Sequence, residues 1–167
     1  MDPHEGLPCV QKSLSELRAW ELQPFAQLSH VADAVMTAHI LVKSVDPLQC
    51  ATLSPKILTE LLRKDLGFDG LVFSDSLVMQ GLLDSSSSIE EAAIRSILAG
   101  CDLLILGGKQ LNASQKGFEL TVEDNLRIHQ AIVKVVQRGR IPMDRIDESY
   151  ARILKSKQKY LYLQLSQ

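Results

Sequence analysis

The chain of 167 residues has few cysteines, no long apolar run and almost no excess of charge, and each absence excludes a class of protein. The formal net charge of -2 gives no electrostatic reason to expect a nucleic acid or an anionic membrane as partner. No apolar run approaches the roughly 20 residues that a membrane span needs. The first residues, MDPHEGLP, have neither the basic region nor the apolar core of a signal peptide. We therefore expect a cytoplasmic protein that binds neither membrane nor nucleic acid.

The few cysteines also bear on whether the chain has disulfides or a metal site. Cys9, Cys50 and Cys101 are odd in number and widely spaced, and no CxxC motif occurs. This pattern argues against a disulfide framework and a zinc site, and it fits a reducing compartment. No two histidines have the spacing of metal ligands. We therefore expect no metal site.

Three short apolar runs predict buried strands, over residues 32–41, 71–73 and 102–106. They recur at intervals of roughly 30–35 residues, the length of a βαβ unit. Apolar residues make up 46% and charged residues 23%, as in an ordinary globular domain. Near-continuous apolar strands that alternate with amphipathic helices favour a parallel sheet covered by helices. The sequence therefore predicts one α/β domain, and the spacing leaves open whether the sheet is open or closed into a barrel.

Helical periodicity and capping residues predict the segments between and around these strands. Ser13 with Glu16, and Ser88 with Glu91, have the spacing of a capping box. Pro24 is expected to break or kink the first helix. Residues 1–12 are expected to be irregular. The predicted helices cover residues 13–28, 54–67, 88–100, 122–138 and 144–160.

Asp75 is the first candidate for chemistry because it directly follows a strongly apolar run, in the stretch GFDGLVFSDSLVMQG at 67–81. In a parallel α/β fold, ligands bind at the carboxyl ends of the strands. A carboxylate there can attack the anomeric carbon of a sugar and form a covalent glycosyl-enzyme that water later hydrolyses. The structural alternative is an aspartate that caps the turn after the strand.

Other polar groups have weaker signals. His39 lies near the end of the first predicted strand, and the pair Gly107-Gly108 follows the third, so they are expected to share an edge of the sheet with Asp75. His39 either lines the site and contacts substrate or is a satisfied core histidine. Asp2 lies two residues before His4, where its carboxylate can accept a hydrogen bond from the imidazole and tune its basicity. The alternative is that this terminal pair has no role.

Five segments of the sequence resemble one known family. DPHEGLP at 2–8 is similar to an Asp-Ser-His segment of that family. ADAVMTAHI at 32–40 and TLSPKILTELLRKDLGFDGLVFSDSLVM at 52–79 match closely and in order. AGCDLLIL at 99–106 and IPMDRIDESYARILKSK at 141–157 resemble the last strand and closing helices. The family is glycoside hydrolase family 3, and the similar members are bacterial β-N-acetylglucosaminidases of the cytoplasmic peptidoglycan-recycling type.

The resemblance implies the retaining hydrolysis of terminal β-linked N-acetylglucosamine from peptidoglycan-derived muropeptides. Asp75 corresponds to the family's nucleophile, His4 to its general acid/base and Asp2 to the carboxylate that partners His4. The family uses no metal or organic cofactor, and its substrate is a glycan that contains N-acetylglucosamine. Pro3 replaces the serine usual between Asp2 and His4. Because proline fixes φ and removes a hydrogen-bond donor, the geometry of Asp2 and His4 is expected to differ from that in the family.

The resemblance also implies a partial TIM barrel, since a whole one takes about 250 residues. Residues 1–167 are expected to be a single partial catalytic domain, with the last three parallel strands and their helices. The family's Lys-His-Phe-Pro-Gly segment has no counterpart here. Three strands cut from a closed barrel leave unpaired edges and exposed apolar faces. We therefore expect little turnover by the chain alone, and association with an N-terminal half-barrel or with itself. The alternative is a non-catalytic binding or assembly module.

Overall fold

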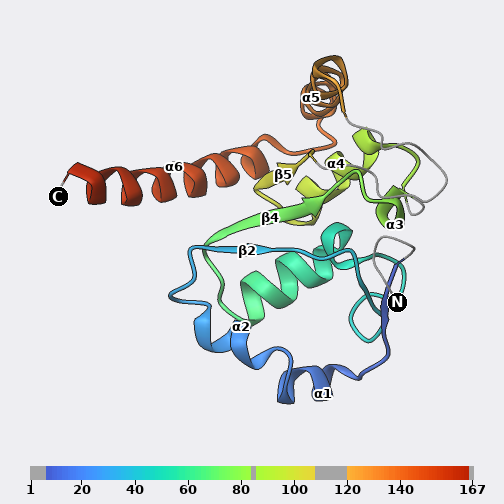
Figure 1. The fold of residues 1–167 in the computed structure, drawn as a ribbon, viewed down its shortest axis with the longest axis vertical. Helices are drawn as coiled ribbons and strands as arrows, with labels where there is room; N and C mark the ends of the chain where they lie inside the picture. The colour runs from blue at the N-terminus through green and yellow to red at the C-terminus, as the bar shows by residue number, and fades with distance from the viewer. Residues whose placement is uncertain (1–6, 84–85, 108–119, 166–167) are drawn as a thin grey trace.

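The computed structural model describes residues 7–83, 86–107 and 120–165 (Figure 1). Its centre is a parallel sheet of three strands, β2 (Ala34–Met36), β4 (Leu71–Ser76) and β5 (Leu103–Ile105), in the order β2-β4-β5. The predicted α/β fold with parallel strands is confirmed.

The two faces of the sheet differ in what covers them. Val72, on β4, is fully buried beneath the helices, where it packs with Leu58 and Leu62. Met36 and Leu103 are the register partners of Phe73, so the three side chains share the opposite face. That face is partly open, since Met36 is 59% exposed.

Helices make the crossovers between neighbouring strands. After the short 3-10 turn η1 (Ala51–Leu53), the π-helix η2 (Lys56–Asp65) leads to β4, and α3 (Gln80–Leu83) and α4 (Ile89–Ala99) lead to β5. Gly67 and Gly100 end η2 and α4 with φ values of 70° and 131°, a region that favours glycine. The Ser88 hydroxyl accepts a hydrogen bond from the Glu91 N–H, which is the N-cap half of the predicted capping box.

The break expected in the helix over residues 13–28 is confirmed, since the segment forms two helices, α1 (Leu14–Ala19) and α2 (Gln23–Leu28), but the break lies at residues 20–22 rather than at Pro24. The break precedes Pro24, which lies in the first turn of α2, where its missing N–H costs nothing. The capping box of Ser13 and Glu16 is confirmed.

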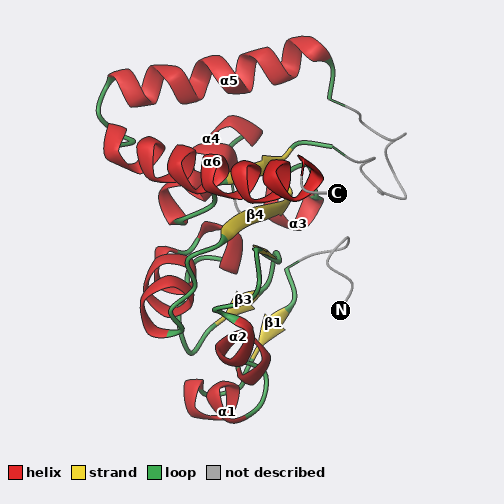
Figure 2. Cartoon of the chain, turned by 90° about the vertical axis from the view of Figure 1, so that its left-hand side faces the viewer, coloured by secondary structure: helices red, strands yellow, loops and turns green. Residues whose placement is uncertain are grey.

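The strand predicted over residues 32–41 is also wrong in extent. The main sheet keeps only β2, and the chain pairs again as β3 (Leu41–Val42) with β1 (Cys9–Val10), inside the region expected to be irregular. Figure 2 shows this second, two-stranded parallel sheet below the main one, beside α1 and α2. In the segment between β2 and β3, the polar side chains of Thr37 and His39 are buried and form hydrogen bonds within the protein.

Two helices complete the described chain, α5 (Val122–Gln137) and α6 (Met143–Leu165). Ile128 of α5 is buried against Ala92 and Ala93 of α4. The last helix runs five residues beyond its predicted end at Tyr160, and in Figure 1 it extends away from the sheet. No helix of the described residues is long and apolar enough to cross a membrane.

A buried carboxylate ties α6 to the sheet. The side chain of Asp102, just before β5, is 0% exposed. It accepts hydrogen bonds from Arg63 of η2 at 2.6 Å and from Arg152 of α6 at 3.1 Å. The Ser149 hydroxyl and the Val72 N–H also donate to it, at 2.7 and 3.0 Å. This cluster lies at the amino end of the strands, the end that stabilises a parallel α/β fold rather than binding ligands.

The three cysteines carry free thiols. Cys9 is exposed, whereas Cys50 and Cys101 are buried. Burial raises the pKa of the Cys101 thiol to about 12 and also raises that of Cys50, so both are unreactive at neutral pH.

Candidate active site

The carboxyl ends of the three main strands meet, as the sequence predicted. The Nε2 atom of His39 lies 2.8 Å from the carbonyl oxygen of Ser76, the last residue of β4. The Ser76 hydroxyl in turn donates to the carbonyl oxygen of Gly107, after β5. The expectation that His39, Asp75 and Gly107 share an edge is confirmed, and Gly108 lies outside the described residues.

Asp75 is half-buried at this edge, and both its backbone and its carboxylate are held. Its N–H donates to the Thr37 hydroxyl oxygen at 3.1 Å, and its Oδ1 accepts from the Ser76 N–H at 2.7 Å. A helix cap would bond an N–H two or three residues further on, so this is not the geometry of a cap. Within the described part of the chain, Oδ2 has no hydrogen-bond partner. One carboxylate oxygen is thus anchored while the other is available to a ligand.

His39 is 1% exposed, and both of its ring nitrogens are bonded within the protein. Nδ1 lies 2.8 Å from the Thr52 hydroxyl, and Nε2 faces the Ser76 carbonyl oxygen. A carbonyl oxygen only accepts, so Nε2 carries a proton. Burial lowers the pKa of His39, which keeps the ring neutral and leaves Nδ1 as an acceptor. This is the arrangement of a satisfied core histidine, one of the two readings that the sequence left open, and substrate binding by His39 stays a prediction.

Sequence reasoning missed two hydroxyl groups at this edge. Thr37 and Thr52 are 8% and 0% exposed, and their hydroxyl oxygens lie 2.9 Å apart. Thr37 lies two residues before His39 in the predicted strand, so the period of two could have placed both on one face. Thr52 lies in η1 and reaches the site only through tertiary contacts, which no local pattern shows.

Asp2, Pro3 and His4 lie outside the described residues, so the predicted dyad stays a prediction. The nearby described chain runs beside the site. The Pro8 carbonyl oxygen accepts a hydrogen bond of 2.8 Å from the N–H of Leu41, two residues after His39. Among the described residues, no three histidine, cysteine, aspartate or glutamate side chains cluster as metal ligands.

The neutral, buried His39 predicts that acid destabilises the fold. Because burial lowers its pKa in the folded state, the unfolded chain binds a proton first, at its ordinary pKa of about 6.5. The stability is therefore fully present above about pH 6.5 and decreases as pH falls toward the lower folded pKa, by at most about 1.4 kcal/mol per pH unit. Urea unfolding at several pH values measures this slope. The slope should be shallower in His39→Gln, and equal slopes in the two proteins would contradict the assignment.

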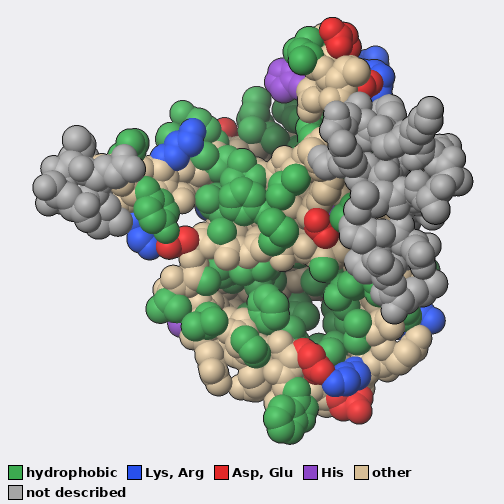
Figure 3. Space-filling model, viewed as in Figure 1, with side chains coloured by type: hydrophobic (Ala, Val, Ile, Leu, Met, Phe, Trp, Pro, Cys, Tyr) green, Lys and Arg blue, Asp and Glu red, His purple; other side chains and the backbone are tan. Residues whose placement is uncertain are grey.

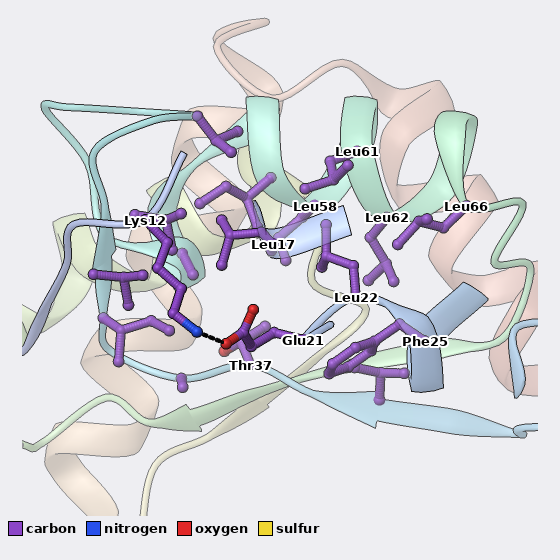
Figure 4. A pocket seen from close by; sticks show the side chains of 18 of the residues that line it. Lys12, Leu17, Glu21, Leu22, Phe25, Thr37, Leu58, Leu61, Leu62 and Leu66 are labelled. Atoms are coloured by element: carbon purple, nitrogen blue, oxygen red, sulfur yellow. Dashed lines mark hydrogen bonds and ion pairs between the residues drawn. The ribbon is translucent and has the colours of Figure 1, made fainter. Parts of the chain in front are cut away.

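A cavity of about 550 Å³ lies elsewhere, between η2, the α1–α2 segment and the edge of β2 (Figure 4). Its lining is mostly apolar, and Lys12 and Glu21 form an ion pair beside it. Residues 35–38, four in succession, line this cavity, so it faces the edge of the β2 segment rather than one of its faces. Its labelled apolar side chains are Leu17, Leu22, Phe25, Leu58, Leu61, Leu62 and Leu66.

Comparisons with known sequences point to one family. The model of the glycosyl hydrolase family 3 N terminal domain matches residues 1–156. A curated beta-hexosaminidase of Pseudomonas aeruginosa is 44% identical over 105 residues, which are 61% of this chain and 30% of that protein. A beta-hexosaminidase of Neisseria meningitidis is 36% identical over 130 residues, 77% of this chain and 36% of the relative. The chain therefore spans about a third of the length of the curated relatives it matches.

Solved structures agree with the sequence matches. A glycoside hydrolase family 3 beta-N-acetylglucosaminidase from Paenibacillus sp. str. FPU-7 superposes with a TM-score of 0.82 and 34% identity, over 95% of this chain and 28% of that one. CbsA from Thermotoga neapolitana superposes with a TM-score of 0.79 and 32% identity, over 93% of this chain and 33% of that one.

Proposed function

Because the chain belongs to glycosyl hydrolase family 3, we propose that it forms part of an enzyme that removes terminal β-linked N-acetylglucosamine from peptidoglycan-derived muropeptides. The observation that carries the proposal is the placement of Asp75. It is the second-last residue of β4, the central strand of the sheet, and one of its carboxylate oxygens is anchored by a peptide N–H. A retaining glycosidase needs such a fixed carboxylate as its nucleophile. The names of the matched relatives support the substrate class.

In the proposed reaction, Asp75 attacks the anomeric carbon while His4 gives a proton to the leaving oxygen, and the glycosidic bond breaks. The product of this step is a covalent ester between the sugar and Asp75. His4, partnered by Asp2, then takes a proton from water as the water oxygen attacks the same carbon and releases Asp75. Two displacements at one carbon retain its configuration. The step needs no metal or organic cofactor.

We also propose that the described strands are the last three of a (β/α)8 barrel. Three features support this. Each strand of the main sheet pairs in parallel with the next main-sheet strand along the chain, as consecutive strands of a barrel do. The sheet face of Met36, Phe73 and Leu103 is partly open, whereas parallel sheets are normally covered on both faces. The apolar cavity at the edge of β2 leaves room for a further strand.

The partner that fits these openings is an N-terminal half-barrel, encoded separately or as part of the same enzyme. Figure 3 shows hydrophobic side chains gathered across the middle of one face, over the main strands and the first part of α6. Exposed apolar residues near β2 include Phe25, Leu28 and Met36, which line a groove between α2, β2 and η2. Self-association is the alternative way to cover them. The three free thiols fit a reducing compartment, so we place the enzyme in the cytoplasm.

The test is the release of nitrophenol from an aryl β-N-acetylglucosaminide. We expect no release by the purified chain, and release after it is refolded with the N-terminal part of the Pseudomonas aeruginosa relative, taken up to the matched region. That N-terminal part alone is the control. A stable complex without turnover would contradict the hydrolytic proposal and favour a binding module. Turnover by the chain alone would contradict the need for a partner.

A further inference from the structure

A series of hydrogen bonds joins the backbone N–H of Asp75 to the backbone carbonyl oxygen of Ser76. The Asp75 N–H donates to Thr37 Oγ1, which lies 2.9 Å from Thr52 Oγ1. The Thr52 hydroxyl lies 2.8 Å from His39 Nδ1, and His39 Nε2 reaches the carbonyl oxygen of Ser76. This series of hydrogen bonds therefore begins at Asp75 of β4 and returns to β4 at the next residue, Ser76.

The neutral state of His39 sets the direction of every bond. The Ser76 carbonyl oxygen can only accept, so the single ring proton is on Nε2, and Nδ1 accepts from the Thr52 hydroxyl. Thr52 has then used its hydrogen, so its oxygen accepts from the Thr37 hydroxyl, whose own oxygen accepts from the Asp75 N–H. The Ala38 carbonyl oxygen, 3.2 Å from the Thr52 hydroxyl, is the longer contact. A neutral His39 completes this sequence of donors and acceptors, whereas a proton on Nδ1 would turn the Thr52 hydrogen toward the Ala38 carbonyl oxygen.

Because the three side chains are buried, the network stabilises one arrangement of the backbone around Asp75. Thr37, Thr52 and His39 are each less than 9% exposed, so water does not replace a lost bond. A core that served stability alone would favour apolar side chains here, because buried hydroxyl groups bring a desolvation penalty. The network instead connects β4 to the segment after β2 and to η1, and it converges on one carboxylate-bearing residue.

We propose that Thr37, Thr52 and His39 are positioning residues, which fix the backbone of Asp75 so that its free carboxylate oxygen points at the anomeric carbon. The inference rests on the proposed function of Asp75 as nucleophile. A nucleophile displaced by about 1 Å loses about a hundredfold in rate. The three residues act through Asp75 and Ser76 and need not touch the sugar.

The kinetic test compares Thr37→Val, which keeps the shape but removes the hydroxyl group, with Thr37→Ser, which keeps the hydroxyl group. In the assembled enzyme, we expect Thr37→Val to lower kcat about a hundredfold with little change in KM, and Thr37→Ser to restore most of it. Thr59→Val is the matched control, because it removes a part-buried hydroxyl group that donates to the Ala99 carbonyl oxygen, at 2.9 Å. Equal kcat for wild type and Thr37→Val would overturn the proposal while leaving the hydrolytic function intact.

A second measurement on the purified chain needs no activity. Proton–nitrogen NMR of the imidazoles, assigned with His39→Gln, should show His39 as the neutral tautomer with its proton on Nε2. Amide exchange at Asp75 and Ser76 should be faster in Thr37→Val than in Thr37→Ser or Thr59→Val. A proton on Nδ1, or unchanged exchange in Thr37→Val, would overturn the network even if the enzyme proved inactive.

Discussion

Replacing Asp102 by alanine is expected to lower the free energy of unfolding by about 3–5 kcal/mol, the cost of removing one partner from a buried ion pair. Its carboxylate is fully buried, and the side chains of Arg63, Arg145 and Arg152 around it are only 12–19% exposed. Without the anion, three positive charges would remain close together in a region of low dielectric. Ser149 and the Val72 N–H would also lose their acceptor.

Urea unfolding followed by circular dichroism measures this effect. Asp69→Ala is the matched control, since Asp69 and its partner Lys155 are 77% and 76% exposed in their side chains. An exposed pair of this kind contributes no more than about 1 kcal/mol. If Asp102→Ala were as stable as Asp69→Ala, the cluster would not be holding α6 and η2 to the sheet.

Replacing Asp75 by alanine is expected to lower the rate of hydrolysis by a factor on the order of 10⁴ or more, as when other covalent enzymes lose their nucleophile. The fold should survive, because Asp75 is only half-buried and the Thr37 hydroxyl still accepts the N–H of residue 75. The measurement is nitrophenol release in the assembled enzyme, with and without azide.

Azide is a small anion that can enter the space left by the carboxylate and attack the anomeric carbon from the same side. We expect it to restore turnover in Asp75→Ala and to give the α-glycosyl azide, since one displacement inverts the configuration. Asp65→Ala is the control, because Asp65 is an exposed residue paired with Arg18. Undiminished hydrolysis by Asp75→Ala, or a rescued product of β configuration, would contradict a nucleophilic role.

Features of the fold and the site that depend on residues close together in the sequence could be predicted, and those that depend on distant residues could not. The central strand and Asp75 were predictable because an apolar run that directly follows a glycine and ends in polar residues is a local signal. The capping box of Ser13 and Glu16 is local as well. The helix break was predicted at Pro24 but lies before it. Proline is accepted in the first turn of a helix, and the sequence does not show where that turn begins.

Interactions between distant residues were not predictable. Thr52 meets Thr37 across 15 positions, and Arg152 meets Asp102 across 50. Nothing in the local sequence of Asp102 distinguishes a buried ion pair from a surface carboxylate. The pairing of β1 with β3 was missed for a related reason, since strands of two residues are too short to show a period.

The order of the strands has a consequence for how this part of the chain folds. Because β4 pairs with β2, the main-sheet strand that precedes it, and with β5, the one that follows it, each added pairing closes one loop of moderate length. The entropy lost on closing a loop grows only slowly with its length, and closing loops one after another avoids a single long closure. The sheet can therefore grow by one strand and its helix at a time, with β4 as the template on which both neighbours form. A substitution that weakens β4 would slow folding more than the same change in β2 or β5.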